Sequence, residues 1–209
     1  MTRLPSMFAV ANLDHMITPI RLLLACVLAT SACRPQAETA ADEQSVVTKR
    51  ASEVLAALEA KDMSRLAPLV HPSQGVRFSP YPHVLETDRT FTRGEVATLW
   101  NATKTFDWGA ADGTGDPIVL PFPKYYGRFV YDHDFARAPK TAYSSAPIRA
   151  SNAISNLAAM YPDARWIEYH FPGFDAKYDG MDWSSLWLVF RRDGPQWFLV
   201  GIVHGSWRI

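Results

Sequence analysis

Ser184–Ile209 reads Ser-Ser-Leu-Trp-Leu-Val-Phe-Arg-Arg-Asp-Gly-Pro-Gln-Trp-Phe-Leu-Val-Gly-Ile-Val-His-Gly-Ser-Trp-Arg-Ile, and this stretch decides the fold. Two runs rich in β-branched and aromatic residues flank the polar segment 192–196, which contains Asp-Gly. This pattern predicts a β-hairpin. Pro195 has no N–H to donate to a strand ladder, so it suits the turn.

The second run of this stretch is apolar at alternating positions on both faces of a strand. Such a strand needs cover on both sides, so we expect it near the centre of a sheet. We expect one of its faces to pack under helices. The residues of that face are Trp197, Leu199, Val203 and Trp207, whereas Phe198, Val200 and Ile202 belong to the other face.

The composition is sufficient for a hydrophobic core and argues against a partner that is bound mainly through net charge. Hydrophobic residues make up 48% of the 209 residues, with seven Trp, and Lys plus Arg balance Asp plus Glu at 21 each. This balance gives no electrostatic footprint for nucleic acid and no polybasic signal for a membrane surface. The length is typical of one domain with a targeting segment.

A signal peptide is predicted at residues 1–32. Arg21 precedes the apolar run 22–29, and the small residues Thr30–Ala32 follow it, which is the order of a secretory signal. The run is shorter than the roughly 20 apolar residues that span a bilayer. Met16 would give a signal of ordinary length, so we interpret it as the true start and expect the protein to be exported.

The two cysteines, Cys26 and Cys33, both lie at or before residue 33, which leaves the folded part without a disulfide. Small residues followed by Cys33 resemble a bacterial lipobox, although Thr30 stands where Leu is usual. The resemblance implies acylation of Cys33 and an anchor in the cell envelope, with residues 33–44 as a flexible tether. The alternative is cleavage without lipidation, which would give a soluble secreted protein.

Residues 45–209 are interpreted as one domain in which helices come first. Apolar residues recur at helical spacing between Ser45 and Leu58, and Asp62 is placed to cap a short second helix. Thr92 and Glu95 have capping-box spacing. Further helical segments are expected at residues 122–133 and 151–160.

Strands are expected mainly in the last third. Residues 165–171 alternate as a strand and precede the closing hairpin, residues 75–79 are extended, and residues 112–117 have turn chemistry. Helices concentrated early and strands late predict an α+β fold with an antiparallel sheet.

Residues 48–209 resemble the NTF2-like (cystatin-related) α+β superfamily. The resemblance is carried by the first helix, Lys61-Asp62, the short second helix, Leu69-Val70-His71-Pro72 and the closing hairpin. It implies helices packed on the concave face of a curved antiparallel sheet. Three segments, residues 70–81, 168–175 and 201–204, resemble bacterial lipoproteins of unassigned function. NTF2-like domains include isomerases, hydrolases, dehydratases and non-catalytic binding modules, so the resemblance names no activity.

Glu168 and His170 lie two apart on a predicted strand and share a face with Trp166. A carboxylate beside an imidazole could perform acid–base chemistry in a pocket. The alternative is an ordinary polar face. His204 lies on an apolar strand, where it could line the same pocket or be a core histidine with one hydrogen bond.

Arg77 lies between apolar residues in a short strand. It could hold an anionic ligand or pair with an internal carboxylate, Asp182 or Glu168, and we favour the internal pair. If a ligand binds, we expect it between the early helices and the C-terminal half of the sheet. The polar contacts would come from Arg77, Glu168, His170 and His204, with Tyr131 and Trp183 as walls.

No motif implies a cofactor or a metal. The acidic clusters 132–134 and 175–182 lack the spacing of an EF-hand loop, and Asp175 and Asp182 are expected to cap loop N–H groups. Three functions stay open. The leading hypothesis is a non-catalytic, lipid-anchored domain that binds a small molecule, a peptide or an envelope component. The alternatives are an isomerase- or hydrolase-type enzyme using a Glu/His pair and a protein-interaction module at the envelope.

Overall fold

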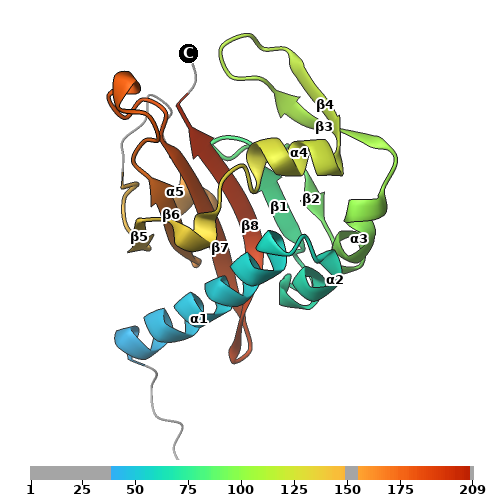
Figure 1. The fold of residues 1–209 in the computed structure, drawn as a ribbon. Coiled ribbons are helices and arrows are strands. Elements are labelled where there is room, and N and C mark those ends of the chain that lie inside the picture. The colour runs from blue at the N-terminus through green and yellow to red at the C-terminus, as the bar shows by residue number, and fades with distance from the viewer. Residues whose placement is uncertain (1–38, 149–154, 208–209) are drawn as a thin grey trace, which may run out of the picture. The chain divides into compact units, whose positions relative to one another are not determined.

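A computed structural model describes residues 39–148 and 155–207 (Figure 1). Its helices are α1 (Ala40–Glu59), α2 (Met63–Leu66), α3 (Arg93–Thr98), α4 (Phe122–Phe129) and α5 (Leu157–Met160), with 3-10 turns at Ala67–Leu69, Leu99–Asn101, Phe135–Arg137 and Ala176–Tyr178. Its strands are β1 (Val76–Ser79), β2 (Thr90–Phe91), β3 (Thr105–Ala110), β4 (Pro117–Pro121), β5 (Lys140–Tyr143), β6 (Arg165–Phe171), β7 (Ser184–Asp193) and β8 (Gln196–Ser206).

The closing hairpin forms the two central strands of a six-stranded sheet with the order β2-β1-β8-β7-β6-β5. Strands β7 and β8 pair antiparallel up to Asp193 and Gln196, which leaves Gly194 and Pro195 as the turn. Gly194 has φ +57°, a left-handed conformation that glycine adopts without steric cost. The predicted hairpin and its central place are therefore confirmed.

The sheet is mixed rather than purely antiparallel. Strand β1 runs parallel to β8, with Arg77 opposite Gly201 and Phe78 opposite Ile202, whereas the other pairs of this sheet are antiparallel. The chain between β1 and β8 leaves the sheet to form α3, α4 and the separate two-stranded sheet of β3 and β4. The α+β class is confirmed, but the antiparallel prediction is wrong for β1.

The first helix starts earlier than its apolar pattern predicts. Thr39 and Asp42 form a capping box, so α1 begins at Ala40 rather than near Ser45. The last residues of the predicted tether are therefore helical. Cys33 and the predicted signal peptide lie outside the described residues. The caps at Asp62 and at Thr92 with Glu95 form as predicted.

One face of the sheet, the helix face, packs under α1, α2 and α4 (Figure 1). Apolar residues of α1 contribute Val47, Val54 and Leu58 to this core, and the sheet contributes Leu188 and Leu199, all with 0% exposure. The other face, the opposite face, packs under α5 and neighbouring loops. Its core contains Val84, Leu157, Tyr161, Trp183, Trp187, Val189, Val200 and Val203.

A β-bulge in β8 changes which side chains reach each face. Val189 pairs with Gly201 and Phe190 pairs with Leu199, so Val200 is the extra residue. Before the bulge, Leu199 reaches the helix face, and after it Ile202 does so. The prediction that Val203 and Trp207 pack under the helices is therefore wrong, because Val203 belongs to the opposite face and Trp207 packs against that same core.

Several segments differ from the sequence expectations. The predicted turn at residues 112–117 joins β3 to β4, two strands that the periodicity did not reveal, and β5 and β2 were also missed. Helix α4 ends at Phe129 instead of near residue 133, and only Leu157–Met160 of the predicted helix 151–160 is helical among its described residues. None of the described helices combines the length and the apolar character needed to cross a bilayer.

Replacing Leu199 by Ala should lower the free energy of unfolding by about 2–5 kcal/mol, because a fully buried side chain is truncated in a filled core. Urea denaturation measures this loss. Leu85→Ala is the matched control, since Leu85 is 48% exposed and its truncation should change stability by less than about 0.5 kcal/mol. Equal losses in the two variants would contradict the placement of β8.

Candidate functional site

Glu168, His170 and Ser185 form a closed polar chain on the opposite face. The Ser185 hydroxyl donates to Glu168 Oε1 over 3.0 Å, and His170 Nδ1 lies 2.7 Å from Ser185 Oγ. The Ile148 N–H donates to Glu168 Oε2 over 2.8 Å. The side chains of Glu168 and His170 are each 2% exposed.

Burial raises the pKa of the Glu168 carboxyl above its ordinary value of 4.5, while the hydrogen bonds from Ile148 and Ser185 oppose this shift. The indole of Trp183 lies beside this chain, with its ring centre 6.0 Å from that of His170. The predicted pairing of Glu168 and His170 on one strand face is confirmed. The closed geometry is that of a structural network that satisfies buried polar groups.

His204 belongs to a second polar cluster, on the helix face. Its Nε2 lies 3.1 Å from Asp132 Oδ2, and that oxygen also accepts from the Ser184 hydroxyl over 3.4 Å. His133 Nε2 lies 3.6 Å from the same oxygen. Burial would raise the pKa of Asp132, but the hydrogen bond and the charge of His204 hold it below its ordinary value.

Strand register separates the two histidines. Residues directly opposite in an antiparallel pair share a face, so His170 shares the face of Ser185, and His204 shares that of Leu186. Because Ser185 and Leu186 are adjacent in β7, the two imidazoles lie on opposite faces of the sheet. The prediction of one pocket lined by Glu168, His170 and His204 is therefore wrong, and the cause is the bulge at Val200.

The remaining predicted residues are also dispersed. Arg77 lies on the opposite face near Tyr161, with its guanidinium carbon 6.0 Å from the ring centre. The favoured internal pair of Arg77 forms with neither predicted carboxylate. Asp182 accepts the N–H groups of Phe174 and Asp175 over 2.9 Å and 2.7 Å. Glu168 accepts from Ile148 and Ser185.

Tyr131 donates to Asp134 over 3.0 Å and does not face Trp183, which packs in the opposite-face core. Asp175 accepts the Lys177 N–H over 3.0 Å. The predicted loop-capping roles of Asp175 and Asp182 are thus confirmed. In residues 39–148 and 155–207, no three His, Cys, Asp or Glu side chains converge to hold a metal ion.

Part of the helix face is filled by aromatic side chains of β1, β3 and α4. Trp108 stacks on Tyr125 with ring centres 3.6 Å apart and an interplanar angle of 12°. Phe78, Phe122 and Phe129 pack around this pair, and all five residues are at most 1% exposed. Aromatic packing of this density stabilises the core and leaves the space between α4 and the sheet to side chains.

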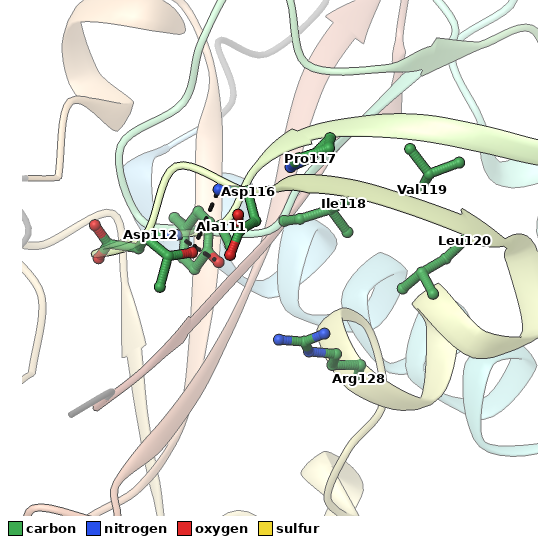
Figure 2. A pocket seen from close by; sticks show the side chains of 10 residues that line it. Ala111, Asp112, Asp116, Pro117, Ile118, Val119, Leu120 and Arg128 are labelled. Atoms are coloured by element: carbon green, nitrogen blue, oxygen red, sulfur yellow. Dashed lines mark hydrogen bonds between the residues drawn. The ribbon is translucent and has the colours of Figure 1, made fainter.

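An open cleft of about 540 Å³ lies outside this core (Figure 2). It is built by β4, by the β3–β4 turn, by Tyr81 and by Arg128 of α4. The Tyr81 hydroxyl accepts the Asp112 N–H over 3.0 Å, which ties the turn to the body of the domain. The lining residues are Tyr81, Ala111, Asp112, Thr114, Asp116, Pro117, Ile118, Val119, Leu120 and Arg128.

The cleft presents charges of both signs around an apolar floor. The side chains of Asp112 and Asp116 make no hydrogen bond or ion pair with the other described residues, and the Arg128 guanidinium lies 4.8 Å from the ring centre of Phe129. Figure 2 shows Asp116 at the turn and Arg128 on the helix below it, with Ile118 and Leu120 between the two elements.

Sequence reasoning missed this cleft. The turn chemistry at residues 112–117 was visible, and so were its carboxylates, but nothing in the local pattern placed Arg128 of a helix beside them. The charged residues of the turn indicate a binding site only once the tertiary structure shows which helix faces them.

No family description and no curated protein matches the sequence of this chain. Among solved structures it is similar to a chain named Rd1NTF2_05, an NTF2-like design, with 14% identity and a TM-score of 0.34 over 78% of this chain and 100% of that one. It is also similar to a protein from Xanthomonas campestris described as a calcium/calmodulin dependent protein kinase II association domain, with 13% identity, a TM-score of 0.32 and coverage of 83% and 91%. The observed class is α+β, with N-terminal helices on a curved mixed sheet.

Glu168→Gln should flatten part of the pH dependence of stability. A carboxyl whose pKa is raised in the folded state binds more protons than in the unfolded chain, so stability falls as pH rises above about 4.5. The amide does not ionise and removes that fall. Urea denaturation between pH 4.5 and 7.5 should therefore show the variant gaining stability relative to the wild type as pH rises.

The exposed Glu86→Gln variant is the control for this measurement, and its profile should run parallel to the wild type. A Glu168→Gln profile that is also parallel would show that the carboxyl is not perturbed by burial.

Proposed function

We propose that the protein is an exported, lipid-anchored, NTF2-like binding domain that holds a small ligand in the cleft between the β3–β4 turn and α4. The observation that carries this proposal is the combination of a filled helix face with an open, bipolar cleft of about 540 Å³ at its border. A binding module needs a preformed surface with a few polar groups, and the cleft supplies one.

The charges of the cleft favour a ligand that carries both signs. Asp112 and Asp116 suit an ammonium group, and the fork of Arg128 suits a carboxylate. The apolar side chains of Ile118 and Leu120 between them suit a short hydrocarbon or peptide backbone. A short zwitterionic peptide is the simplest molecule with these features.

The enzyme alternative is less well supported by the geometry. Glu168 and His170 lie in a closed network, and His204 is 1% exposed with its Nε2 directed at Asp132. A general base must reach the proton it abstracts, directly or through one water. Substrate access to either cluster would require the surrounding side chains to move.

The interaction-module alternative has one observation in its favour. Phe174, Tyr178 and Met181, in the loop before β7, are 48%, 42% and 41% exposed, and Tyr178 and Met181 border a hollow of about 220 Å³ with Trp207. Exposed apolar side chains that gather in one loop are typical of a contact surface. This loop is separate from the cleft and would serve a macromolecular partner.

The proposed anchor is tested at Cys33. In a bacterial host the mature protein should begin at Cys33, carry acyl chains and sediment with membranes, as intact mass and fractionation would reveal. Cys33→Ser should abolish both properties, whereas Cys26→Ser should keep them. Arg34 after the Cys resembles lipoproteins sent to an outer membrane, so that membrane is the expected fraction where the host has one. A soluble wild-type protein with an unmodified N-terminus would refute the anchor.

The proposed ligand class is tested with trialanine as the probe in isothermal titration calorimetry at pH 7. Arg128→Gln and Asp116→Asn should each weaken binding about tenfold or more, because each removes a charge-assisted hydrogen bond. Lys124→Gln is the matched control, since Lys124 is an exposed cation of the same helix that does not line the cleft. Equal affinities in the wild type and both cleft variants would exclude this site.

A further inference from the structure

Another, smaller cavity lies on the opposite face of the sheet. Its volume is about 150 Å³, and it is surrounded by Arg77 of β1, Arg191 of β7 and Tyr161, which follows α5. None of its lining residues belongs to the cleft at the β3–β4 turn. Gln74, Thr90, Met160 and Val200 complete its lining.

Both arginines bring positive charge to this cavity, and neither makes an ion pair with a carboxylate of the described residues. The Nε atoms of Arg77 and Arg191 are buried and lack a hydrogen-bond partner among the described residues. Arg191 Nη1 donates to Gln74 Oε1 over 2.7 Å, a neutral partner. In the described part of the chain no carboxylate lies within 4.0 Å of either guanidinium group, although Asp88 is close enough to Arg77 to feel its charge. Two like charges around one cavity repel each other, and an anion between them would relieve that repulsion.

Tyr161 adds an unused hydrogen-bond donor. It is 5% exposed, and its hydroxyl donates to none of the described residues. Burial raises its pKa, while the charge of Arg77 and a hydrogen bond that Arg77 donates to the hydroxyl oppose the shift, so the hydroxyl keeps its proton at neutral pH and can donate it. Gly201 makes room for it, because a Cβ at that position would come within 2.9 Å of the hydroxyl oxygen.

We propose that this cavity binds a phosphate group through Arg77, Arg191 and Tyr161. Two guanidinium groups match a group that carries nearly two negative charges, as a phosphate does at neutral pH, better than they match a carboxylate with one. The planar forks can each bind two oxygens, and the tyrosine hydroxyl can donate to a third. The phosphate can be free or can be the terminal group of a monoester, whose organic part would extend out of the open cavity.

The test is isothermal titration calorimetry with inorganic phosphate, glycerol 3-phosphate and acetate at pH 7.5 and constant ionic strength. We expect both phosphates to bind and acetate to bind at least about tenfold more weakly. Equal affinities for the two phosphates would identify a free phosphate as the natural ligand, and tighter binding of the ester would identify a monoester. Acetate that binds as tightly as phosphate would overturn the proposal.

Variants assign the binding to this cavity. Arg77→Met and Arg191→Met should each weaken phosphate binding about tenfold or more, and Tyr161→Phe, which keeps the packing of the ring, should weaken it severalfold. Arg192→Met is the matched control, because Arg192 is an exposed neighbour outside the cavity whose Nε donates to the Gly194 carbonyl. Thermal melts in the absence of phosphate report whether each variant folds. Phosphate affinity unchanged in Tyr161→Phe and in a folded arginine variant would overturn the assignment.

Discussion

The extra residue in β8 is the constraint on which both faces of the sheet depend. Up to Leu199 the odd-numbered side chains of β8 face the helices, and after Val200 the even-numbered ones do. Ile202 can therefore enter the core under the helices, and His204 meets Asp132. Without the bulge, His204 would share the face of His170, and Val203 would replace Ile202 under α4. One inserted position thus decides which polar group is buried with which partner.

The aromatic filling of the helix face has a functional consequence. Curved sheets with helices on their concave side are suited to an internal pocket, but here Trp108 and Tyr125 occupy that space with their stacked rings. The hollows proposed as binding sites lie instead where elements meet at the surface. One lies between the β3–β4 turn and α4, and another lies where β1, β7 and the end of α5 converge.

Local chemistry in the sequence predicted the local features well. The hairpin follows from two apolar runs around Asp-Gly, and the caps at Asp62 and Thr92 follow from hydrogen bonds within three residues. The parallel pairing of β1 with β8 joins residues more than 100 positions apart, and no local pattern encodes it. The bulge was equally hidden, because β8 is apolar on both faces and alternation gives no signal where the register shifts.

The candidate site was less predictable, because it too depends on how distant strands pair. Glu168 and His170 share a face because two positions separate them, and this part of the reasoning was sufficient. The relation of His204 to that pair depended on the register across β7, and the neighbours of Arg77 depended on where Tyr161 and Arg191 pack. Chemistry that is assembled from distant strands requires the tertiary structure.

The edge strands of the six-stranded sheet, β2 and β5, affect how copies of the domain can associate. Strand β2 has only two residues and β5 has four, so each border exposes few free backbone groups for another chain to pair with. The outer strands of many β-proteins are guarded in this way against uncontrolled polymerisation. Copies of the domain at high local concentration would therefore not extend one another's sheets. Any assembly that they form would depend on contacts between side chains.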